Sequence, residues 1–135
     1  MAGLIKINWS FNANINGGPQ LGAFQPAFDV SAYDYIKVTL PPPSGGTAST
    51  STDVHLQGGT AAGTVVLLAI LADKYSDKIS YTVDAVATAR VLDGPHVFLG
   101  SGAVGFMNNA PPQKLTFVNA VPDAVTMQIL VGRTA

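Results

Sequence analysis

The sequence predicts an all-β protein, an antiparallel β-sandwich of jelly-roll-like type. The chain has no Glu, 14 Gly and 9 Pro, so residues that favour strands and turns replace strong helix formers. Short segments of alternating apolar and polar residues recur from end to end and are separated by turn residues. Many short strands of this kind suit two antiparallel sheets packed face to face. With 135 residues and no compositional boundary, residues 1–135 are predicted to form a single domain.

The first two predicted strands lie at residues 4–9 and 11–15. In the first, apolar Ile5, Ile7 and Trp9 fall on one side, which indicates one buried face. The sequence Asn-Gly-Gly-Pro at residues 16–19 then ends the alternation with turn residues.

The stretch at residues 21–30 lacks strand alternation although it contains two phenylalanines, Phe24 and Phe28. Large aromatic side chains outside a regular element are suited to anchoring in a partner's pocket. We therefore predict that Phe24 and Phe28 are assembly contacts.

The next predicted strand, residues 33–40, is followed by a long loop at residues 41–52. The loop begins with Pro41, Pro42 and Pro43 and continues with Gly, Ser and Thr, so a stiff start precedes a flexible stretch. A structureless loop of this length is uncommon in a compact domain. It is either a tolerated hairpin loop or an arm that orders against a neighbouring subunit, and in the second case its three prolines are assembly contacts.

The middle of the chain contains a glycine-rich turn, residues 58–63, between predicted strands at 53–57 and 64–71. The apolar run at residues 65–72 is also compatible with a short buried helix, because periodicity does not separate the two in a continuous run. Paired β-branched residues favour the strand. The remaining predicted strands lie at residues 78–83, 85–92, 97–100, 103–107, 114–118 and 124–131.

The charge content bears on the class of partner. Charged residues make up 11% of the chain, against about 25% in an ordinary soluble domain, and 47% of residues are hydrophobic. A sparsely charged surface with a net charge of -1 favours association with copies of itself or with other proteins. The 7 Lys and Arg residues are scattered singly, so we expect no nucleic-acid partner. The longest apolar run is too short to cross a bilayer and residues 1–10 lack a secretory signal, so we expect no membrane partner and synthesis in the cytoplasm.

No group of residues indicates catalysis, and we expect neither an enzyme nor a cofactor or metal requirement. Cysteine is absent, and the glycine-rich stretch lacks the Lys that completes a phosphate-binding loop. Asp73 and Asp77 are too few for a calcium site, and we interpret them as a polar turn. His55 and His96 have no identifiable third partner for metal binding or general-base chemistry.

One part of the chain resembles small virion proteins of tailed bacteriophages. The motifs are Asp34-Tyr35-Ile36, the stretch Gly-Gly-Thr-Ala-Ala-Gly-Thr-Val-Val at residues 58–66, and Tyr-Ser-Asp-Lys-Ile at residues 75–79. The resemblance covers about residues 33–83; the insertion at 41–52 and the region after Arg90 depart from the pattern. It implies a non-enzymatic structural role and transfers no catalytic residue.

The leading hypothesis is therefore a phage capsid decoration or cement subunit that assembles as a repeated homo-oligomer. Its partners would be itself and other virion proteins, and its location the virion. A tail, neck or fibre component is the alternative within this class. A carbohydrate-binding β-sandwich module is the alternative outside it, because Tyr33 and Tyr35 share one strand face and could stack on sugar rings. That module would be favoured if the side chains of Trp9, Tyr33 or Tyr35 lay in a row and were exposed to solvent.

Overall fold

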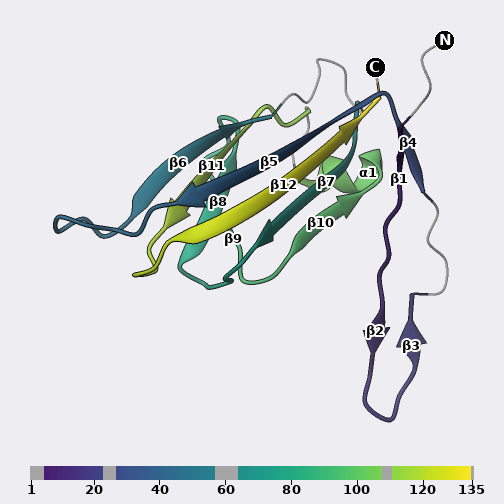
Figure 1. Ribbon diagram of the computed structural model, residues 1–135, viewed down its shortest axis with the longest axis horizontal. Coiled ribbons are helices and arrows are strands. Elements are labelled where there is room, and N and C mark those ends of the chain that lie inside the picture. Colours follow the sequence, from purple (N-terminus) through teal and green to yellow (C-terminus); the bar gives the residue numbers. More distant parts are fainter. Residues whose placement is uncertain (1–4, 23–26, 57–63, 108–110, 135) are drawn as a thin grey trace.

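The computed structural model describes residues 5–22, 27–56, 64–107 and 111–134, and confirms an all-β chain with antiparallel sheets (Figure 1). One short helix, α1 (Ser101–Met107), is present in these ranges. The strands are β1 (Ile5–Ile7), β2 (Ala13–Asn14), β3 (Gln20–Leu21), β4 (Phe28–Val30), β5 (Ala32–Leu40), β6 (Thr50–His55), β7 (Val65–Ala72), β8 (Ile79–Val83), β9 (Arg90–Val91), β10 (His96–Leu99), β11 (Lys114–Asn119) and β12 (Val125–Arg133).

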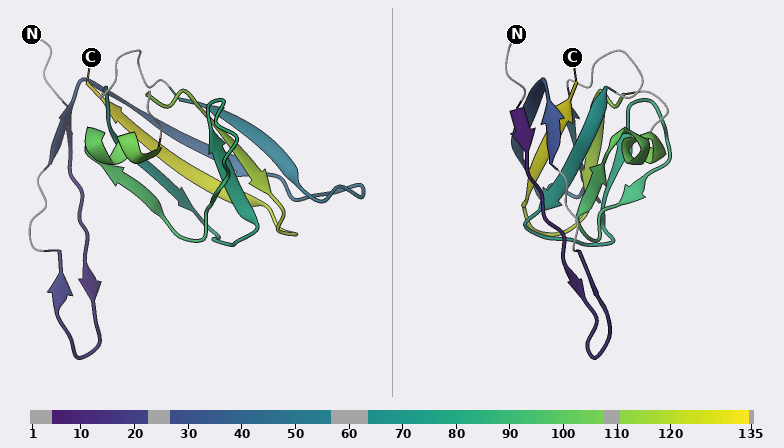
Figure 2. Two further views of the ribbon diagram at one scale, coloured as in Figure 1. Left: turned by 180° about the vertical axis from the view of Figure 1, so that it is seen from behind. Right: turned by 90° about the vertical axis from the view of Figure 1, so that its right-hand side faces the viewer.

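Eight of these strands form two four-stranded sheets that face each other in a sandwich-like arrangement (Figure 2). The first sheet has the order β10-β7-β12-β5 and the second has the order β6-β11-β8-β9. All neighbouring strands are antiparallel. The chain moves from one sheet to the other at every connection from β5 to β12 except that between β8 and β9, so the other neighbouring strands are not consecutive in the sequence.

The core lies between the two sheets and follows the two-residue period of the strands. On β8, Ile79, Tyr81 and Val83 are buried while the residues between them are half-buried. The same alternation runs along β11 and β12, whose inward side chains meet those of β8. Burying each large apolar side chain contributes about 1.5–3 kcal/mol. The largest of these fully buried side chains are Tyr81, Phe117, Leu40, Leu68, Ile70, Ile79, Leu92, Leu115, Met127 and Ile129.

The apolar run at residues 65–72 forms a strand, β7, as predicted. It lacks alternation because β7 lies inside the first sheet, where both of its faces are partly covered. Leu68 and Ile70 point into the core, whereas Leu67 is buried on the opposite face. There Leu67 lies beside Gly132. A Cβ atom on Gly132 would lie 2.9 Å from Ile7 Cδ1 and 3.2 Å from Val30 Cγ1, which is closer than ordinary packing allows. The small β1-β4 sheet therefore packs on the outside of the first sheet.

Two predicted strands are wrong. Residues 103–107 belong to α1, whose first turn is set by Ala103 N–H and Val104 N–H, both donating to the Gly100 carbonyl at 3.1 Å. Its buried side chains, Val104 and Met107, are three residues apart, which is helical spacing.

The predicted strand at residues 85–92 shrinks to β9, Arg90–Val91. The chain leaves the second sheet at Asp84, which has a φ of 50°. The Asp84 carboxylate accepts hydrogen bonds from the backbone N–H groups of Gln113 and Lys114, both at 2.8 Å. These bonds hold the turn after β8 against the start of β11.

A buried amide, Asn119, joins three parts of the chain at one end of the two sheets. Its side-chain nitrogen donates to the carbonyl oxygens of Pro41, at 3.1 Å, and Asp123, at 3.0 Å. Its side-chain oxygen accepts from Val121 N–H at 3.0 Å. Asn119 is 0% exposed, so these groups depend on each other rather than on water.

We predict that Asn119→Ala lowers the free energy of unfolding by about 2–4 kcal/mol, because three hydrogen bonds are lost and buried polar groups are left unpaired. Urea unfolding at neutral pH measures this change. Asn14→Ala, a change at an exposed position of β2, is the control and should alter stability by less than about 0.5 kcal/mol. An Asn119→Ala protein as stable as the control would contradict this role.

Candidate assembly surfaces

The most unusual feature of the fold is an arm, residues 8–22, that extends away from the two sheets (Figures 1 and 2). Its outer part is the β2-β3 hairpin, which has only two residue pairs, Ala13 with Leu21 and Asn14 with Gln20. No residue from 8 to 22 is charged. The exposed fractions of three apolar side chains on the arm are high: 50% for Phe11, 62% for Ile15 and 65% for Leu21.

Local turn chemistry explains why the arm forms. Gly17 has a φ of 71°, and the N–H of Gly18 donates to the carbonyl of Ile15 at 2.8 Å, closing the tip. At the base, Gly22 has a φ of 131° and lies so close to the Phe11 backbone that any side chain would collide with it. The arm is thus a defined hairpin, but a two-stranded hairpin without a sheet or helix against it is marginally stable in water.

The second feature is the outer face of the first sheet, the side turned away from the core. In one row across the sheet, Tyr35 pairs with Leu130, Leu130 with Ala69, and Ala69 with Val97. Tyr35 is 57% exposed and Val97 is 50% exposed. The side chains that we assign to this outer face are those of Tyr33, Tyr35, Lys37, Ala69, Leu71, Val97, Leu99, Gln128 and Leu130.

A groove of about 630 Å³ lies where the base of the arm meets the outer face at β10. Trp9, Ser10 and Phe11 line it from the arm, and Pro95, Val97 and Leu99 line it from the sheet. None of these six residues is charged, and five are apolar. The groove is therefore suited to apolar side chains rather than to an ion.

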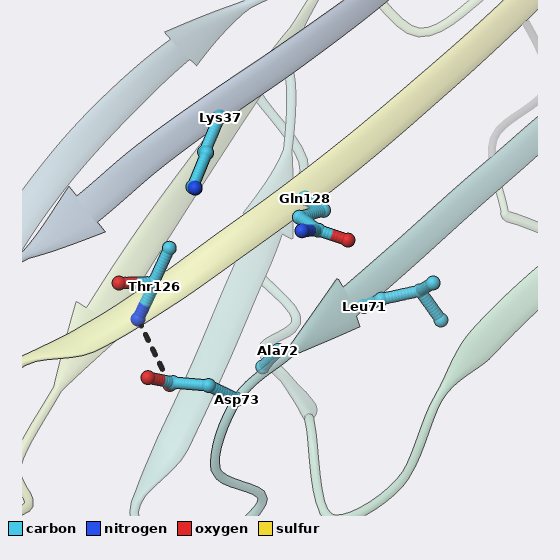
Figure 3. A pocket seen from close by; sticks show the side chains of 6 residues that line it. All are labelled: Lys37, Leu71, Ala72, Asp73, Thr126 and Gln128. Atoms are coloured by element: carbon cyan, nitrogen blue, oxygen red, sulfur yellow. Dashed lines mark hydrogen bonds between the residues drawn. The ribbon is translucent and has the colours of Figure 1, made fainter.

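A smaller and more polar pocket, of about 370 Å³, lies on the same face at the other end of β12 (Figure 3). The Asp73 carboxylate accepts a hydrogen bond from Thr126 N–H at 3.0 Å, and Lys37 and Gln128 lie nearby on β5 and β12. Leu71 and Ala72 complete its wall. The Asp73–Thr126 bond fixes the turn after β7, which agrees with the interpretation of Asp73 as part of a polar turn.

Of the predicted aromatic contacts, Phe28 lies on β4, half-buried and stacked on Trp9 with ring centroids 6.5 Å apart. Phe28 is therefore held by its own chain at the root of the arm. Phe24 lies outside the described residues. Their role as assembly contacts stays a prediction.

The predicted loop at residues 41–52 is shorter, because β6 already begins at Thr50. Pro41 is anchored: its carbonyl accepts hydrogen bonds from the Thr50 hydroxyl, at 2.5 Å, and from Asn119. Pro42 and Pro43 are half-buried, and Ser44 and Thr47 close a turn beyond them. The loop and the arm extend from opposite ends of the sheets (Figure 1). An assembly role for Pro41, Pro42 and Pro43 stays a prediction.

The histidines do not come together. His55 is exposed on β6, whereas His96 on β10 has its Nδ1 atom 2.7 Å from the hydroxyl of Tyr81. Burial raises the pKa of Tyr81 to about 12, and nearby Arg90 opposes this rise. Burial also lowers the pKa of His96; Asp93 opposes that effect and Arg90 adds to it. The Tyr81–His96 pair thus joins the second sheet to the first as a neutral hydrogen bond.

Across the described ranges, no group of three or more His, Cys, Asp or Glu residues is placed to hold a metal ion. In the same ranges, no helix has the length and hydropathy needed to cross a bilayer. Comparisons with protein-family models, with curated proteins and with solved structures found no significant match.

Strand alternation predicts neither the arm nor the groove. It predicts a strand over residues 11–15, whereas only Ala13 and Asn14 pair, and it does not mark Ile15, Leu21 or Val97 as contact residues. The available signal was the run of fifteen uncharged residues from 8 to 22, which has apolar residues but no continuous pattern.

We predict that acid destabilises the protein through His96. Its folded-state pKa lies below the usual 6.5, so as the pH falls from 6.5 the unfolded chain binds a proton first. The stabilising contribution is complete above about pH 6.5 and is lost as the pH falls through the lower, folded-state pKa. The Tm of the wild type should therefore fall between pH 7.5 and pH 5.5, and His96→Gln should reduce this fall.

His55→Gln is the matched control, because His55 is exposed and lies on the other sheet. It should keep the wild-type dependence of Tm on pH. If His96→Gln also kept it, the destabilisation by acid would have another source.

Proposed function

We propose that the protein is a non-enzymatic structural subunit of a virus particle and that it works as a repeated oligomer. Within this class we favour a capsid decoration or cement subunit. The observation that carries the proposal is the arm, whose Phe11, Ile15 and Leu21 are at least half exposed and which has no charged residue. Exposing the apolar surface of such a segment to water is unfavourable in free energy, and the segment is stabilised when a neighbouring subunit covers it.

The strand order supports the same class. Numbered from β5 to β12, the first sheet holds strands 1, 8, 3 and 6 and the second holds 2, 7, 4 and 5. We infer from this order a jelly-roll topology, an eight-stranded arrangement used by viral capsid domains as well as by lectins and cupins. Because one fold serves many functions, the topology supports a virion role without being sufficient for it.

A non-enzymatic role is consistent with the structural hydrogen bonds of three polar side chains. Asp73 is hydrogen-bonded to the backbone of β12, Asp84 to that of β11, and His96 to Tyr81. Each of these groups has a structural task that accounts for its position. In this proposal the chain is made in the host cytoplasm and ends in the virion, with itself and other virion proteins as partners and no cofactor.

A tail, neck or fibre subunit is the alternative within this class. The symmetry of the oligomer would distinguish it from a capsid decoration subunit. Phe24, Phe28 and Pro41–Pro43 remain proposed contacts in either case. Hydrogen bonds to the Pro41 carbonyl fix the base of the loop. The turn at residues 44–47 is the part of the loop furthest along the chain from these bonds.

A carbohydrate-binding module is a second candidate, favoured by the exposure of Tyr33 and Tyr35, at 50% and 57%, side by side on β5. Lys37 follows on the same face of β5 and pairs with Gln128 of β12, so both supply polar groups on that face. Aromatic rings with adjacent hydrogen-bonding groups suit a sugar. Retention on immobilised glycans that is lost in Tyr33→Ala/Tyr35→Ala, but kept in Phe106→Ala at another exposed aromatic residue, would favour this candidate.

We predict that the purified full chain forms a closed oligomer at micromolar concentration, because exposed apolar side chains on the arm and outer face are covered by association. Sedimentation velocity over a hundredfold range of concentration measures this. Raising the salt concentration from 0.1 to 1 M should not dissociate the oligomer, since few charges are available to hold it together.

A chain that remains monomeric over that whole range would contradict the proposed function. Dissociation by salt would contradict the apolar nature of the contacts. Detection of the chain in purified virus particles would support the location in the virion independently of the sedimentation result.

A further inference from the structure

We propose that the β2-β3 arm of one copy docks into the groove of a second copy, and that the exchange is reciprocal. The inference rests on the proposed function, because it assumes that the chain self-associates. It adds the contact surface and the partner: Ile15 and Leu21 of one copy occupy the groove of the other.

The groove has the chemistry of a site for apolar side chains. Val97 and Leu99 on β10, with Pro95, form one wall, and Trp9 and Phe11 form the other. Its volume, about 630 Å³, falls within the range of pockets that enclose several side-chain-sized groups. Val97 is half exposed, so the wall on β10 is accessible from outside.

The arm supplies the matching occupant. Ile15 and Leu21 are the most exposed apolar side chains on the arm, at 62% and 65%. No charged side chain lies between residues 8 and 22, and none of the described residues that line the groove is charged, so docking would bury no unpaired charge at these positions.

The tip of the arm does not reach the groove of its own copy, although residues 9–11 at its base line that groove. Phe11, at the base of the arm, is itself part of the groove wall, and Ile15 lies four residues further along, about 13 Å in an extended strand. Folding the tip back would break the pairing of Ala13 with Leu21 and of Asn14 with Gln20. A second copy can be reached without any such change.

Because the arm and the groove are adjacent in one chain, a two-fold axis between them lets each arm enter the other copy's groove. Such an isologous contact closes on itself, so it gives a dimer rather than a filament. This dimer is one symmetric contact in the repeated oligomer, and other surfaces can join dimers together.

The apolar area is sufficient for a stable contact. On each copy, Phe11, Ile15, Leu21 and Val97 are at least half exposed, and Tyr33, Tyr35 and Leu71 add exposed area on the same outer face. An aromatic side chain has roughly 150–250 Å² to bury. The side chains on the outer face extend from the β10 edge to the β5 edge of the sheet, so all seven are covered only if the second copy lies over the whole outer face. Such a contact would bury on the order of 700 Å² per copy, close to the roughly 800 Å² per partner of a standard stable interface.

Two single variants and their mixture test the proposal in the full chain. Leu21→Lys puts a charge on the arm, and Val97→Glu puts the opposite charge in the groove. Each variant alone should weaken dimerisation by at least about tenfold, because both contacts of its dimer then bury an unpaired charge. The mixture should dimerise again, since one contact then pairs Lys with Glu and the other is wild type.

Two matched controls place similar charges elsewhere. Val86→Lys lies in the loop after β8 and Val91→Glu lies on β9; these valines are 43% and 44% exposed. The controls should dimerise like the wild type. Far-UV circular dichroism and Tm check that Leu21→Lys and Val97→Glu remain folded, and Ile15→Lys serves as a second arm variant. The core cluster contains neither Leu21 nor Val97, so the fold should be retained.

The outcomes separate this inference from the proposed function. Weakened single variants with a restored mixture support arm exchange. Single variants that associate like the wild type, or a mixture that stays monomeric, overturn arm exchange even if the wild type is oligomeric. A wild type that is monomeric at every concentration overturns the proposed function and arm exchange together.

Discussion

The arrangement of this protein depends on one constraint: the first sheet is apolar on its inner face and over much of its outer face as well. Strand β7 makes this plain, since Leu68 and Ile70 are buried on the core side and Leu67 is buried on the other. The second sheet covers only the inner face. The outer face is covered in part by β1 and β4, which pack at Gly132 because that position has no side chain. The rest of the outer face remains open.

The open remainder of that face and the arm have complementary properties. Both are apolar and almost free of charge, and both present half-exposed side chains such as Val97 and Leu21. A chain with 11% charged residues has few means of keeping such surfaces apart by repulsion. The proposed association of two copies would cover both surfaces. Polar groups such as Asn119 and Asp84 meanwhile hold the turns at the ends of the sheets.

Much of the fold could be predicted from the sequence, because β5, β8, β11 and β12 alternate with a period of two, and prolines follow β5 and β11. The wrong strand at residues 103–107 arose because a short apolar run fits a helix as well as a strand; the three-residue spacing of Val104 and Met107 was the relevant signal. The groove could not be predicted, because it brings residues 9–11 beside residues 95–99. No local pattern records such a long-range contact.

Hydrogen–deuterium exchange of the unmodified chain, in dilute and in concentrated solution, tests most directly whether the open outer face and the arm cover each other. If the two surfaces dock, the backbone amides of residues 12–21 and of β10 exchange more slowly in the concentrated sample, because docking removes both from solvent. The amides of β8, already inside the core sheets, should exchange equally in both. Equal exchange of the arm at both concentrations, in a sample shown to be oligomeric, would contradict the account.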